Sequence, residues 1–334
     1  MSAARSTITV VAAVLRDGEG RVLLAERPAG KEMAGKWELP GGKVQAGESL
    51  HGALARELDE ELGVRTLSSR PLLQLAHDYP ERRVILHARE ALHAGQPQSR
   101  EGQSLRWVDL ADEAAFATLD LLEADGPIVT AMGLPARYLI TPPQLSAQEV
   151  GTFLHRAADA GIRLVQLRQP HADSAALGSL CAAFEQALGE RARAGEVTPS
   201  WLLGGDPAQT VPLAEAHGAL AGLHLPARFL GQLPRLRGLA DERGWRLMCS
   251  CHDPDELATA AAHGADAAVL GPVLPTPSHP EAEPLGWARF AEWLIDLPLP
   301  VFAIGGMHEA LLSTAWEAGA QGVAGIRGLA ETTA

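Results

Sequence analysis

The sequence predicts two domains of different fold class, an α+β domain followed by an α/β barrel of the (β/α)8 type. The chain has 334 residues, and domains average about 150 residues. Strand-like runs and one amphipathic helix fill the first third, whereas a regular alternation of apolar runs and Ala-rich stretches fills the rest. The pattern changes at Gly133, Leu134 and Pro135. We therefore expect a first domain at 1–133, a linker at 134–137 and a second domain at 138–334.

In the first domain, short runs rich in β-branched and apolar residues predict strands. These runs cover 8–15, 21–26, 37–39, 84–88 and 105–108. The turn signal 17–20 between the first two runs predicts a hairpin.

Two helices complete this domain. Leu50, Leu54, Leu58 and Leu62 repeat every fourth residue, which predicts a helix over 49–62. A closing helix is expected over 120–132, where Pro127 marks either a kink or a helix start near Asp125.

In the second domain, eight apolar runs predict eight strands. They begin at Tyr138, Leu164, Trp201, Gly222, Arg246, Ala267, Val301 and Gly322. Helix-compatible stretches such as 147–160 and 254–263 lie between them. Eight alternating units in about 195 residues predict a small (β/α)8 barrel, close to the lower size limit of that fold.

The composition excludes several classes of protein. The hydrophobic fraction of 46% and the charged fraction of 21% are typical of globular chains rather than disordered ones. The net charge of −13 argues against a nucleic-acid polymer as partner, although a metal ion would allow a single nucleotide to bind. The N-terminal apolar run ends at Arg16, too early for a secretory signal or a membrane span. We expect a cytoplasmic protein without a membrane partner, and the sequence gives no indication of its oligomeric state.

The three cysteines, Cys181, Cys249 and Cys251, are too few for a disulfide framework in a chain of this length. Cys249 and Cys251 stand next to His252, but a second pair of zinc ligands at suitable spacing is missing. We therefore expect small buried side chains rather than a structural zinc site.

An acidic cluster on the predicted 49–62 helix is the strongest chemical signal. Glu57, Glu60 and Glu61 lie at i, i+3 and i+4, so that they share one helix face and repel one another. A solvated acidic face is one interpretation. The other is a site for Mg²⁺ or Mn²⁺, which prefer carboxylate oxygens and bridge to substrate phosphates. Arg56 is placed to orient a carboxylate, and the turn at Gly41 would let a backbone carbonyl face the metal.

The run from Gly42 to Val64 resembles the Nudix box, G-x5-E-x7-R-E-U-x-E-E-x-G-U, at every specified position. The resemblance covers about residues 5–132. It implies a Nudix fold, with a mixed sheet between helices, that hydrolyses a nucleoside diphosphate linked to another group. It also implies that Glu57, Glu60 and Glu61 hold Mg²⁺, with Mn²⁺ as the alternative. Glu48 is then the outer carboxylate, the Gly41 carbonyl a backbone ligand, and a box glutamate or Glu101 the general base.

Segments outside the box resemble the MutT branch of this family. They are 27–28, 36–43, 79–82, 101–103 and 124–127. The resemblance implies removal of 8-oxo-dGTP as monophosphate and pyrophosphate, which cleans the nucleotide pool and limits replication errors. It also implies substrate contacts from Arg27, Glu38, Leu39, Arg82 and Asp125. Two of these positions depart from MutT, since Asp125 replaces an asparagine that reads the oxidised purine and Leu39 replaces an aromatic residue.

Five segments of the second domain, 138–141, 166–168, 250–252, 271–277 and 303–306, resemble those of thiamine phosphate synthase and of its relative, the thiazole tautomerase TenI. The resemblance covers about 138–328. The similarity implies a phosphorylated thiazole or pyrimidine as ligand. The residues implied at that site are Gln166, Arg168, Asp206, His252, Gly305, Gly306 and Arg327. Independently of the resemblance, paired glycines after the seventh strand and 325–327 after the eighth stand where such barrels often bind phosphate.

Several synthase positions are changed in this barrel. Gln169 replaces a lysine, Gly205 replaces the Asn of an Asn-Asp pair, and no acidic residue follows Leu225. A further lysine is replaced around Ser278 and His279. Three hypotheses follow: a MutT-like hydrolase with a degenerate barrel, a bifunctional thiamine-pathway enzyme, or a hydrolase whose barrel only binds a ligand. The changed positions favour the first and third, because a reaction that expels pyrophosphate needs the missing charges.

Overall fold

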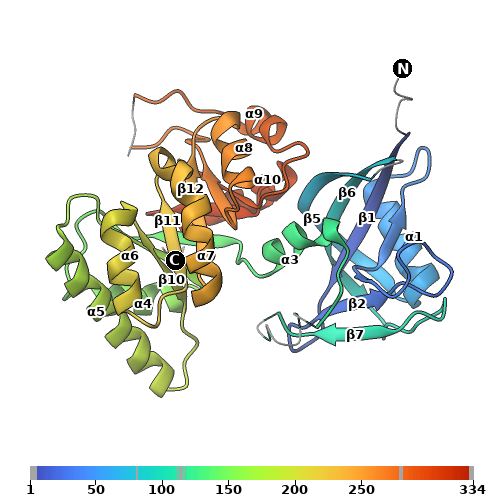
Figure 1. Cartoon of the computed structure of the whole chain (residues 1–334), viewed down its shortest axis with the longest axis horizontal. Coiled ribbons are helices and arrows are strands. Elements are labelled where there is room, and N and C mark those ends of the chain that lie inside the picture. Colours follow the sequence, from blue (N-terminus) through green and yellow to red (C-terminus); the bar gives the residue numbers. More distant parts are fainter. Residues whose placement is uncertain are drawn as a thin grey trace. The chain divides into compact units, whose positions relative to one another are not determined.

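The computed structural model describes residues 6–79, 82–110, 112, 116, 118–277 and 281–330. The chain divides into two compact units, Met1–Leu134 with Leu294–Pro298 and Pro135–Trp293 with Leu299–Ala334. Their elements follow the colour ramp from blue to red (Figure 1).

The first unit contains two sheets. A four-stranded mixed sheet has the order β4-β1-β6-β5, in which only β1 and β6 are parallel. A three-stranded antiparallel sheet has the order β3-β2-β7. The strands are β1 (Ser6–Leu15), β2 (Val22–Glu26), β3 (Trp37–Glu38), β4 (Gly41–Lys43), β5 (Arg65–Asp78), β6 (Arg82–Ala94) and β7 (Leu105–Val108).

Strand β1 is buried on both faces, so its side chains enter two different cores. Val11 packs with the leucine stripe of α1 (Leu50–Leu62), and Val14 packs with Ile128 of α3 (Gly126–Met132). The mixed sheet therefore lies between two helices, which confirms the expected α+β architecture.

The local expectations for this unit differ from the structure at four places. Strands β1 and β2 belong to different sheets and share only the bridge Arg16↔Val22, so the predicted hairpin is wrong although its turn exists. The cause is that β4 and β6 occupy both edges of β1. Strand β5 was not predicted, and β6 is longer than expected. The closing helix α3 starts at Gly126 after the 3₁₀ turn η1 (Glu123–Asp125), so Pro127 marks a helix start.

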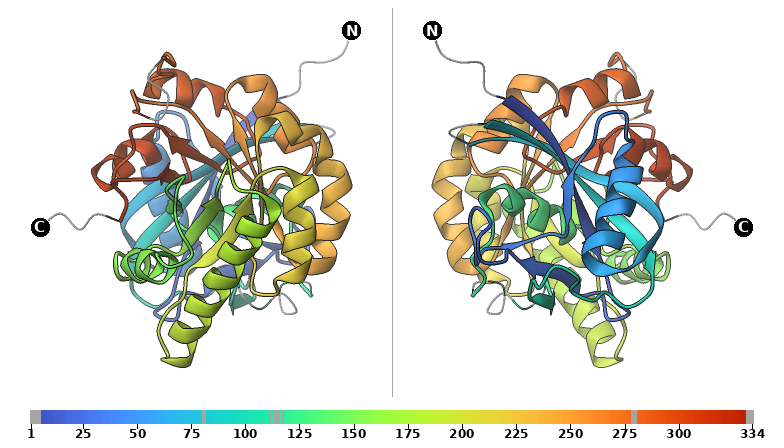
Figure 2. Two further views of the ribbon diagram at one scale, coloured as in Figure 1. Left: turned by 90° about the vertical axis from the view of Figure 1, so that its left-hand side faces the viewer. Right: turned by 90° about the vertical axis from the view of Figure 1, so that its right-hand side faces the viewer.

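The second unit is a closed barrel of eight parallel strands (Figures 1 and 2). Each of the eight predicted runs forms one strand. The strands are β8 (Arg137–Ile140), β9 (Leu164–Arg168), β10 (Ser200–Gly204), β11 (Gly222–Leu225), β12 (Arg246–Cys251), β13 (Ala267–Leu270), β14 (Val301–Ile304) and β15 (Gly322–Gly325). Strand β15 pairs with β8 and closes the ring. The (β/α)8 prediction is confirmed.

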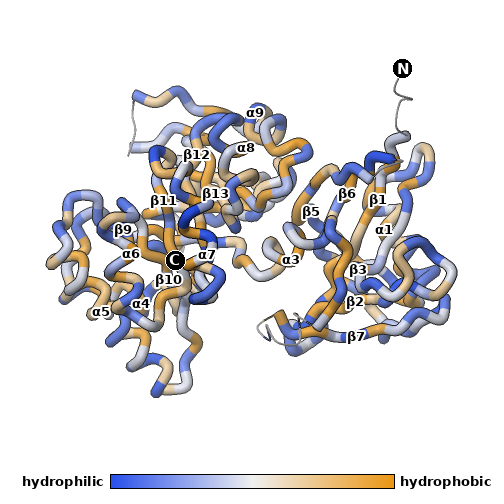
Figure 3. Tube along the Cα trace, viewed as in Figure 1, coloured by the Kyte–Doolittle hydropathy of each residue, from blue (hydrophilic) through white to orange (hydrophobic). Residues whose placement is uncertain are grey.

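Helices cover the outside of the barrel. They are α4 (Val150–Asp159), α5 (Ser174–Arg193), α6 (Pro207–Ala216), α7 (Leu233–Arg243), α8 (Pro254–Ala262), α9 (Trp287–Trp293) and α10 (Leu312–Glu317), with 3₁₀ turns η2 (Ala227–Gln232) and η3 (Glu309–Leu311). The barrel strands are largely apolar (Figure 3). Cys181, Cys249 and Cys251 are buried and free, as expected. Among the described residues, no helix is both long and apolar enough to cross a bilayer.

Candidate functional site

Helix α1 carries the acidic cluster and is fixed at its start and along one side. The Ser49 hydroxyl caps its first turn by accepting from the Gly52 N–H at 3.0 Å. Leu54, Leu58 and Leu62 are fully buried along one stripe. With this stripe anchored, Glu57, Glu60 and Glu61 are left beside strand β4, which packs against α1.

The paired glycines let β4 approach the acidic helix closely. A Cβ atom on Gly42 would lie 2.3 Å from the Glu57 carboxyl carbon, and one on Gly41 would lie 2.1 Å from the Val11 carbonyl oxygen. At Gly41, which has a φ of +153° and meets backbone, only glycine allows this approach, whereas at Gly42 a side chain would displace the Glu57 carboxylate. The Gly41 N–H also donates to Glu61 Oε2 at 3.2 Å. The loop before α1 and the helix itself therefore form one site.

Arg56 collects three of the carboxylates. Its Nε lies 3.0 Å from Glu48 Oε1, and one terminal nitrogen lies 2.8 Å from Glu57 and 3.2 Å from Glu60. Hydrogen bonds from Arg56 lower the pKa of Glu48, and the same bonds to Glu48 and Glu57 raise the pKa of Arg56. The guanidinium thus supplies the positive charge that keeps this group of carboxylates together.

Glu61 lies outside the reach of Arg56 and is the most perturbed carboxylate of the cluster. Burial is the largest cause that raises its pKa to about 7; the Gly41 hydrogen bond opposes this rise, and the negative charges of Glu101, Glu57 and Glu38 add to it. A buried carboxylate facing other carboxylates is stabilised by a bound cation.

The donor chemistry of the cluster suits a hard divalent cation, because every candidate ligand atom is oxygen. In the described part of the chain, no three His, Cys, Asp or Glu side chains already converge on one point as a metal site. Glu48, Glu57 and Glu60 direct oxygens at Arg56 instead. The residues therefore fit a metal by chemistry, and Glu57 and Glu60 would turn from Arg56 toward Glu61 to bind it.

The loop that carries Glu101 is attached to the end of α1. The Gln98 N–H donates to the Leu62 carbonyl at 2.9 Å, and the Arg100 N–H donates to the Glu61 carbonyl at 2.9 Å. These bonds satisfy carbonyl groups that a helix end otherwise leaves open. They also hold Glu101 near Glu61, as the charge effect on Glu61 indicates.

Lys31 is a residue of this site that the sequence reasoning missed. Its ammonium group lies 2.8 Å from Glu101 Oε2, and the pKa of Lys31 is raised by Glu101 first and then by Glu61 and Glu38. A single lysine in a loop gives no sequence signal, so only the fold reveals this placement.

Three of the residues expected to contact the substrate, Arg27, Glu38 and Leu39, lie around Asp125. Asp125 is 4% exposed, and burial raises its pKa to about 7, with a smaller effect from Glu38. The Leu39 backbone N–H donates to Asp125, whereas Asp125 Oδ2 is buried without a partner among the described residues. Burial also raises the pKa of Glu38, which is paired with Arg27.

Two of the expected substrate residues have local roles. Leu39 is 4% exposed and packs in the core below α3. Arg82 pairs with Glu32. Of the MutT-like segment 79–82, Pro80 and Glu81 lie outside the described residues.

The residues named for the barrel lie on or after the carboxyl ends of its strands, where barrels of this type hold ligands. Several have clear local partners. Asp206 Oδ1 caps α6 by accepting from the Ala208 N–H at 2.9 Å. His252 Nδ1 lies 2.9 Å from Glu256 Oε2, and the His252 side chain is 61% exposed.

The other barrel residues differ in their surroundings. A Cβ on Gly305 would lie 2.6 Å from Pro272 Cβ, and one on Gly306 would lie 2.8 Å from Leu274 Cβ, so packing alone requires glycine. Gln166 is 2% exposed inside the barrel. Burial and the nearby Arg228 lower the pKa of Arg168. Arg327 is exposed just after β15. Ser278 and His279 lie outside the described residues.

A buried hydrogen-bonded group in the barrel was also missed. The Tyr138 hydroxyl lies 3.0 Å from His224 Nδ1, and His224 Nε2 lies 2.9 Å from Ser250 Oγ. Burial lowers the pKa of His224 to about 3. His224 is therefore neutral, and its two nitrogens serve one donor and one acceptor.

Comparison with known proteins assigns each unit. The NUDIX domain family matches residues 6–130, and the thiamine monophosphate synthase family matches residues 137–329. The CTP pyrophosphohydrolase of Escherichia coli is 38% identical over 123 residues, which are 35% of this chain and 90% of the relative. This chain belongs to both families.

Two further similar proteins each match one of the two units. The 8-oxo-dGTP diphosphatase of Proteus vulgaris is 38% identical over 82 residues, which are 25% of this chain and 73% of the relative. A solved thiamine phosphate pyrophosphorylase from Pyrococcus furiosus covers 57% of this chain and 84% of its own, with 20% identity and a TM-score of 0.44. The chain thus joins a MutT-like Nudix domain, of a family that acts on phosphoric anhydrides and generally needs a divalent metal, to a thiamine-phosphate-synthase-like barrel.

Proposed function

We propose that the Nudix domain hydrolyses oxidised purine nucleoside triphosphates such as 8-oxo-dGTP to monophosphate and pyrophosphate, with Mg²⁺ or Mn²⁺ as cofactor. The observation that carries the proposal is the partly buried Glu61, whose pKa is raised to about 7 beside Glu57 and Glu101. Perturbed carboxylates of this kind concentrate at functional sites. A relative named 8-oxo-dGTP diphosphatase supports the choice of substrate.

In the proposed mechanism, Glu48, Glu57, Glu60, Glu61 and the Gly41 carbonyl hold the metal. Bound magnesium would neutralise phosphate oxygens and make a water molecule more acidic. Arg56 orients Glu48 and Glu57. Water attacks phosphorus, its proton passes to a glutamate, and the bond to the pyrophosphate leaving group breaks.

The proton acceptor is either a box glutamate or Glu101. The ion pair between Lys31 and Glu101 supports a box glutamate, because the Glu101 carboxylate already has a charged partner. Glu61, with its pKa about 7, is suited to take a proton near neutral pH.

Arg27, Glu38, Leu39, Arg82 and Asp125 are proposed to contact the nucleotide. The buried, unpartnered Oδ2 of Asp125 is available to a base edge. With its pKa about 7, this carboxyl can accept a hydrogen bond when ionised or donate one when protonated. Purines and pyrimidines both present such groups, so CTP is a second candidate substrate, as the name of the Escherichia coli relative suggests.

A pyrophosphate-release assay of the full chain tests the proposal. Its substrates are 8-oxo-dGTP, dGTP and CTP, each with Mg²⁺, Mn²⁺ or EDTA. We expect metal-dependent release that is fastest with 8-oxo-dGTP. Fastest release with CTP would replace the substrate assignment, and absence of release with every nucleotide would refute the hydrolase.

For the barrel we propose binding of a phosphorylated thiazole or pyrimidine without synthase chemistry. Gln169, at the position of a synthase lysine, is 9% exposed and donates to the Pro142 carbonyl at 2.6 Å. Asp206 is occupied as a helix cap. We expect the gene to rescue a mutator strain but not a thiamine auxotroph, and rescue of the auxotroph would restore the bifunctional hypothesis.

A further inference from the structure

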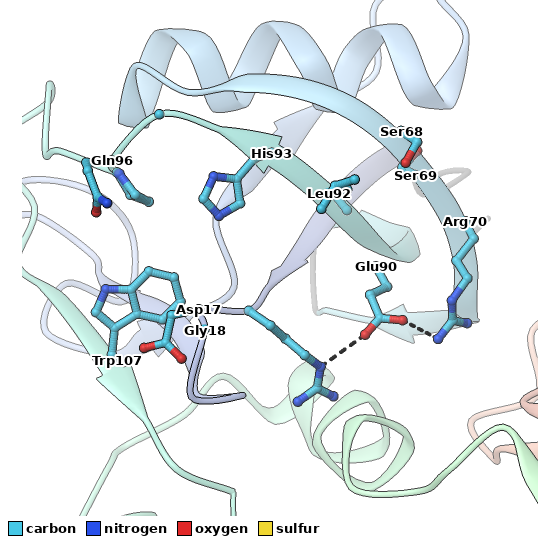
Figure 4. Close-up of a pocket in the computed structure, with 14 residues that line it drawn as sticks. Asp17, Gly18, Ser68, Ser69, Arg70, Glu90, Leu92, His93, Gln96 and Trp107 are labelled. Carbon is cyan, nitrogen blue, oxygen red and sulfur yellow. Dashed lines mark hydrogen bonds and ion pairs between the residues drawn. The ribbon is translucent and has the colours of Figure 1, made fainter. Parts of the chain in front are cut away.

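A cavity of about 620 Å³ lies in the first unit, and none of the proposed catalytic or metal-binding residues lines it. Its walls come from the turn after β1, from β5 and β6, and from Trp107 of β7 (Figure 4). The volume lies in the usual range for sites that bind small molecules.

One side of the cavity presents guanidinium groups. Arg16 Nε lies 3.0 Å from Glu90 Oε1, and Arg70 pairs with the other oxygen of Glu90, so two guanidinium groups share this carboxylate. The described hydrogen bonds of Arg16 use three of its five N–H donors. Burial lowers the pKa of Arg70.

The second carboxylate of the wall does not oppose this charge. Asp17 Oδ1 accepts from the backbone N–H groups of Glu19 and Arg21 at 3.0 Å, and Asp17 Oδ2 accepts from the Arg21 side chain at 2.8 Å. Asp17 is therefore directed at its own turn, where Arg21 is shared between Asp17 and Glu19. Near Glu90 the two guanidinium groups outnumber the one carboxylate, which suits an anion.

The other side of the cavity suits a flat ring. Trp107 lies across the cavity from Glu90, and the ring of His93 extends between them (Figure 4). His93 Nδ1 is buried with no hydrogen-bond partner among the described residues. A half-turn of this ring about its Cβ–Cγ bond would present a nitrogen to a ligand. Leu92, at the wall, is 62% exposed and adds apolar surface.

We propose that this cavity is a second ligand site, which takes a heteroaromatic phosphate monoester. The ring would stack on Trp107 and bond to His93, and the phosphate would face Arg16 and Arg70. Two sources share this chemistry: a nucleoside monophosphate, as released by the proposed hydrolysis, and a phosphorylated thiazole, as proposed for the barrel.

Calorimetry of the full chain in EDTA tests the proposal, because the metal-dependent site is then disabled. The probes are dGMP and hydroxyethylthiazole phosphate. Arg70→Gln should weaken binding of the accepted probe by about tenfold or more, the equivalent of one strong charged contact. The comparison variant Arg89→Gln removes a charge that does not itself line the cavity and reaches it only through its bonds to Ser69, so it should change binding by less than about twofold.

A second pair of variants avoids the buried arginine. Leu92→Glu places a negative charge at the cavity and should weaken binding by about fivefold, whereas Leu67→Glu, 48% exposed and outside the lining, should not. Tighter binding of dGMP would identify a nucleoside monophosphate as the ligand of the cavity. Tighter binding of hydroxyethylthiazole phosphate would identify a phosphorylated thiazole instead. Hydrogen exchange should show protection at 90–97 rather than at 48–61.

Two results would overturn the site. One is that neither probe binds at concentrations up to about 5 mM, since a dedicated cavity would bind its ligand more tightly than that. The other is equal weakening by Arg70→Gln and Arg89→Gln. The Glu57→Gln variant, which disables the proposed hydrolase, should bind both probes as the unaltered chain does, so failure of the cavity and failure of the hydrolase are separable.

Discussion

The two domains differ in how their polar residues are balanced. In the Nudix domain, carboxylates crowd together, and the partly buried Glu61 and the buried Asp125 both have a pKa raised to about 7. In the barrel, Asp206 caps a helix and His252 pairs with Glu256 in the solvent. Burying a carboxylate without a partner destabilises a protein unless a bound ligand compensates for it. The contrast therefore supports the proposal that hydrolysis takes place in the Nudix domain and not in the barrel.

The largest expected effect tests this contrast directly. Glu61→Gln should lower kcat for pyrophosphate release by about two to four orders of magnitude, because it removes a proposed metal ligand and proton acceptor. The matched change in the barrel, His252→Gln, should leave this rate unchanged. The assay is single-substrate kinetics with Mg²⁺.

Circular dichroism should show the same secondary structure in both variants, since neither residue is part of a core. Near-normal turnover by Glu61→Gln would remove the reason to place the chemistry in this domain.

The second effect concerns stability and pH. Burial raises the pKa of Asp125 from 3.8 to about 7, so the folded state binds its proton more tightly than the unfolded state does. Stability is therefore lost as pH rises from about 4 to about 7, and the full cost, about 4 kcal/mol, is present above pH 7. Asp125→Asn should recover most of this free energy of unfolding at pH 8 and almost none at pH 4.

Urea unfolding in EDTA, monitored through hydrogen exchange of the β5 and β6 amides, measures the free energy of unfolding of both proteins at each pH. Asp120→Asn is the control, because the Asp120 side chain is 73% exposed and no such gain is expected. An equal gain in the free energy of unfolding from Asp125→Asn at both pH values would mean that ionisation of Asp125 is not what destabilises the folded state.

The third effect belongs to the barrel. Tyr138→Phe removes the hydroxyl partner of His224 Nδ1 and should cost about 1–3 kcal/mol, the usual penalty for a buried polar atom left unpaired. Because His224 has its pKa lowered to about 3, the loss should be the same at pH 6 and pH 8.

Hydrogen exchange of the barrel strands measures this loss, and pyrophosphate release should remain unchanged. A loss of hydrolysis on Tyr138→Phe would show that the domains are coupled and would weaken the comparison.

Local patterns in the sequence predicted the parts of the fold that local physics determines. Eight apolar runs gave eight barrel strands, because a strand buried on both faces is continuously apolar. The leucine stripe of α1 gave a helix whose ends are close to the observed ones. Pairing partners were harder to predict, since β1 could pair with its neighbour β2 but is flanked by β4 and β6. Such long-range choices depend on the whole sheet.

The candidate sites show the same limit. The spacing of Glu57, Glu60 and Glu61 is local and was visible in the sequence. Lys31 and Glu101 meet only because two loops converge, and Asp206 serves as a helix cap because α6 begins directly after it. Which catalytic role each predicted residue has stays a prediction until the variants above are measured.

The smallest expected effect concerns Lys31, which lies beside the proposed metal site of the Nudix domain. Lys31 pairs with Glu101 across a partly exposed surface, so Lys31→Met should change the free energy of unfolding by less than about 1 kcal/mol. It also removes a positive charge near Glu61 and Glu38, and should therefore strengthen Mg²⁺ binding by about two- to fivefold at low salt. Calorimetric titration at low and high salt should show this gain shrinking as salt screens it. Lys36→Met, which breaks the pair with exposed Asp120, is the matched control. Weaker Mg²⁺ binding by Lys31→Met would mean that the Lys31–Glu101 pair organises the metal site rather than competing with the metal.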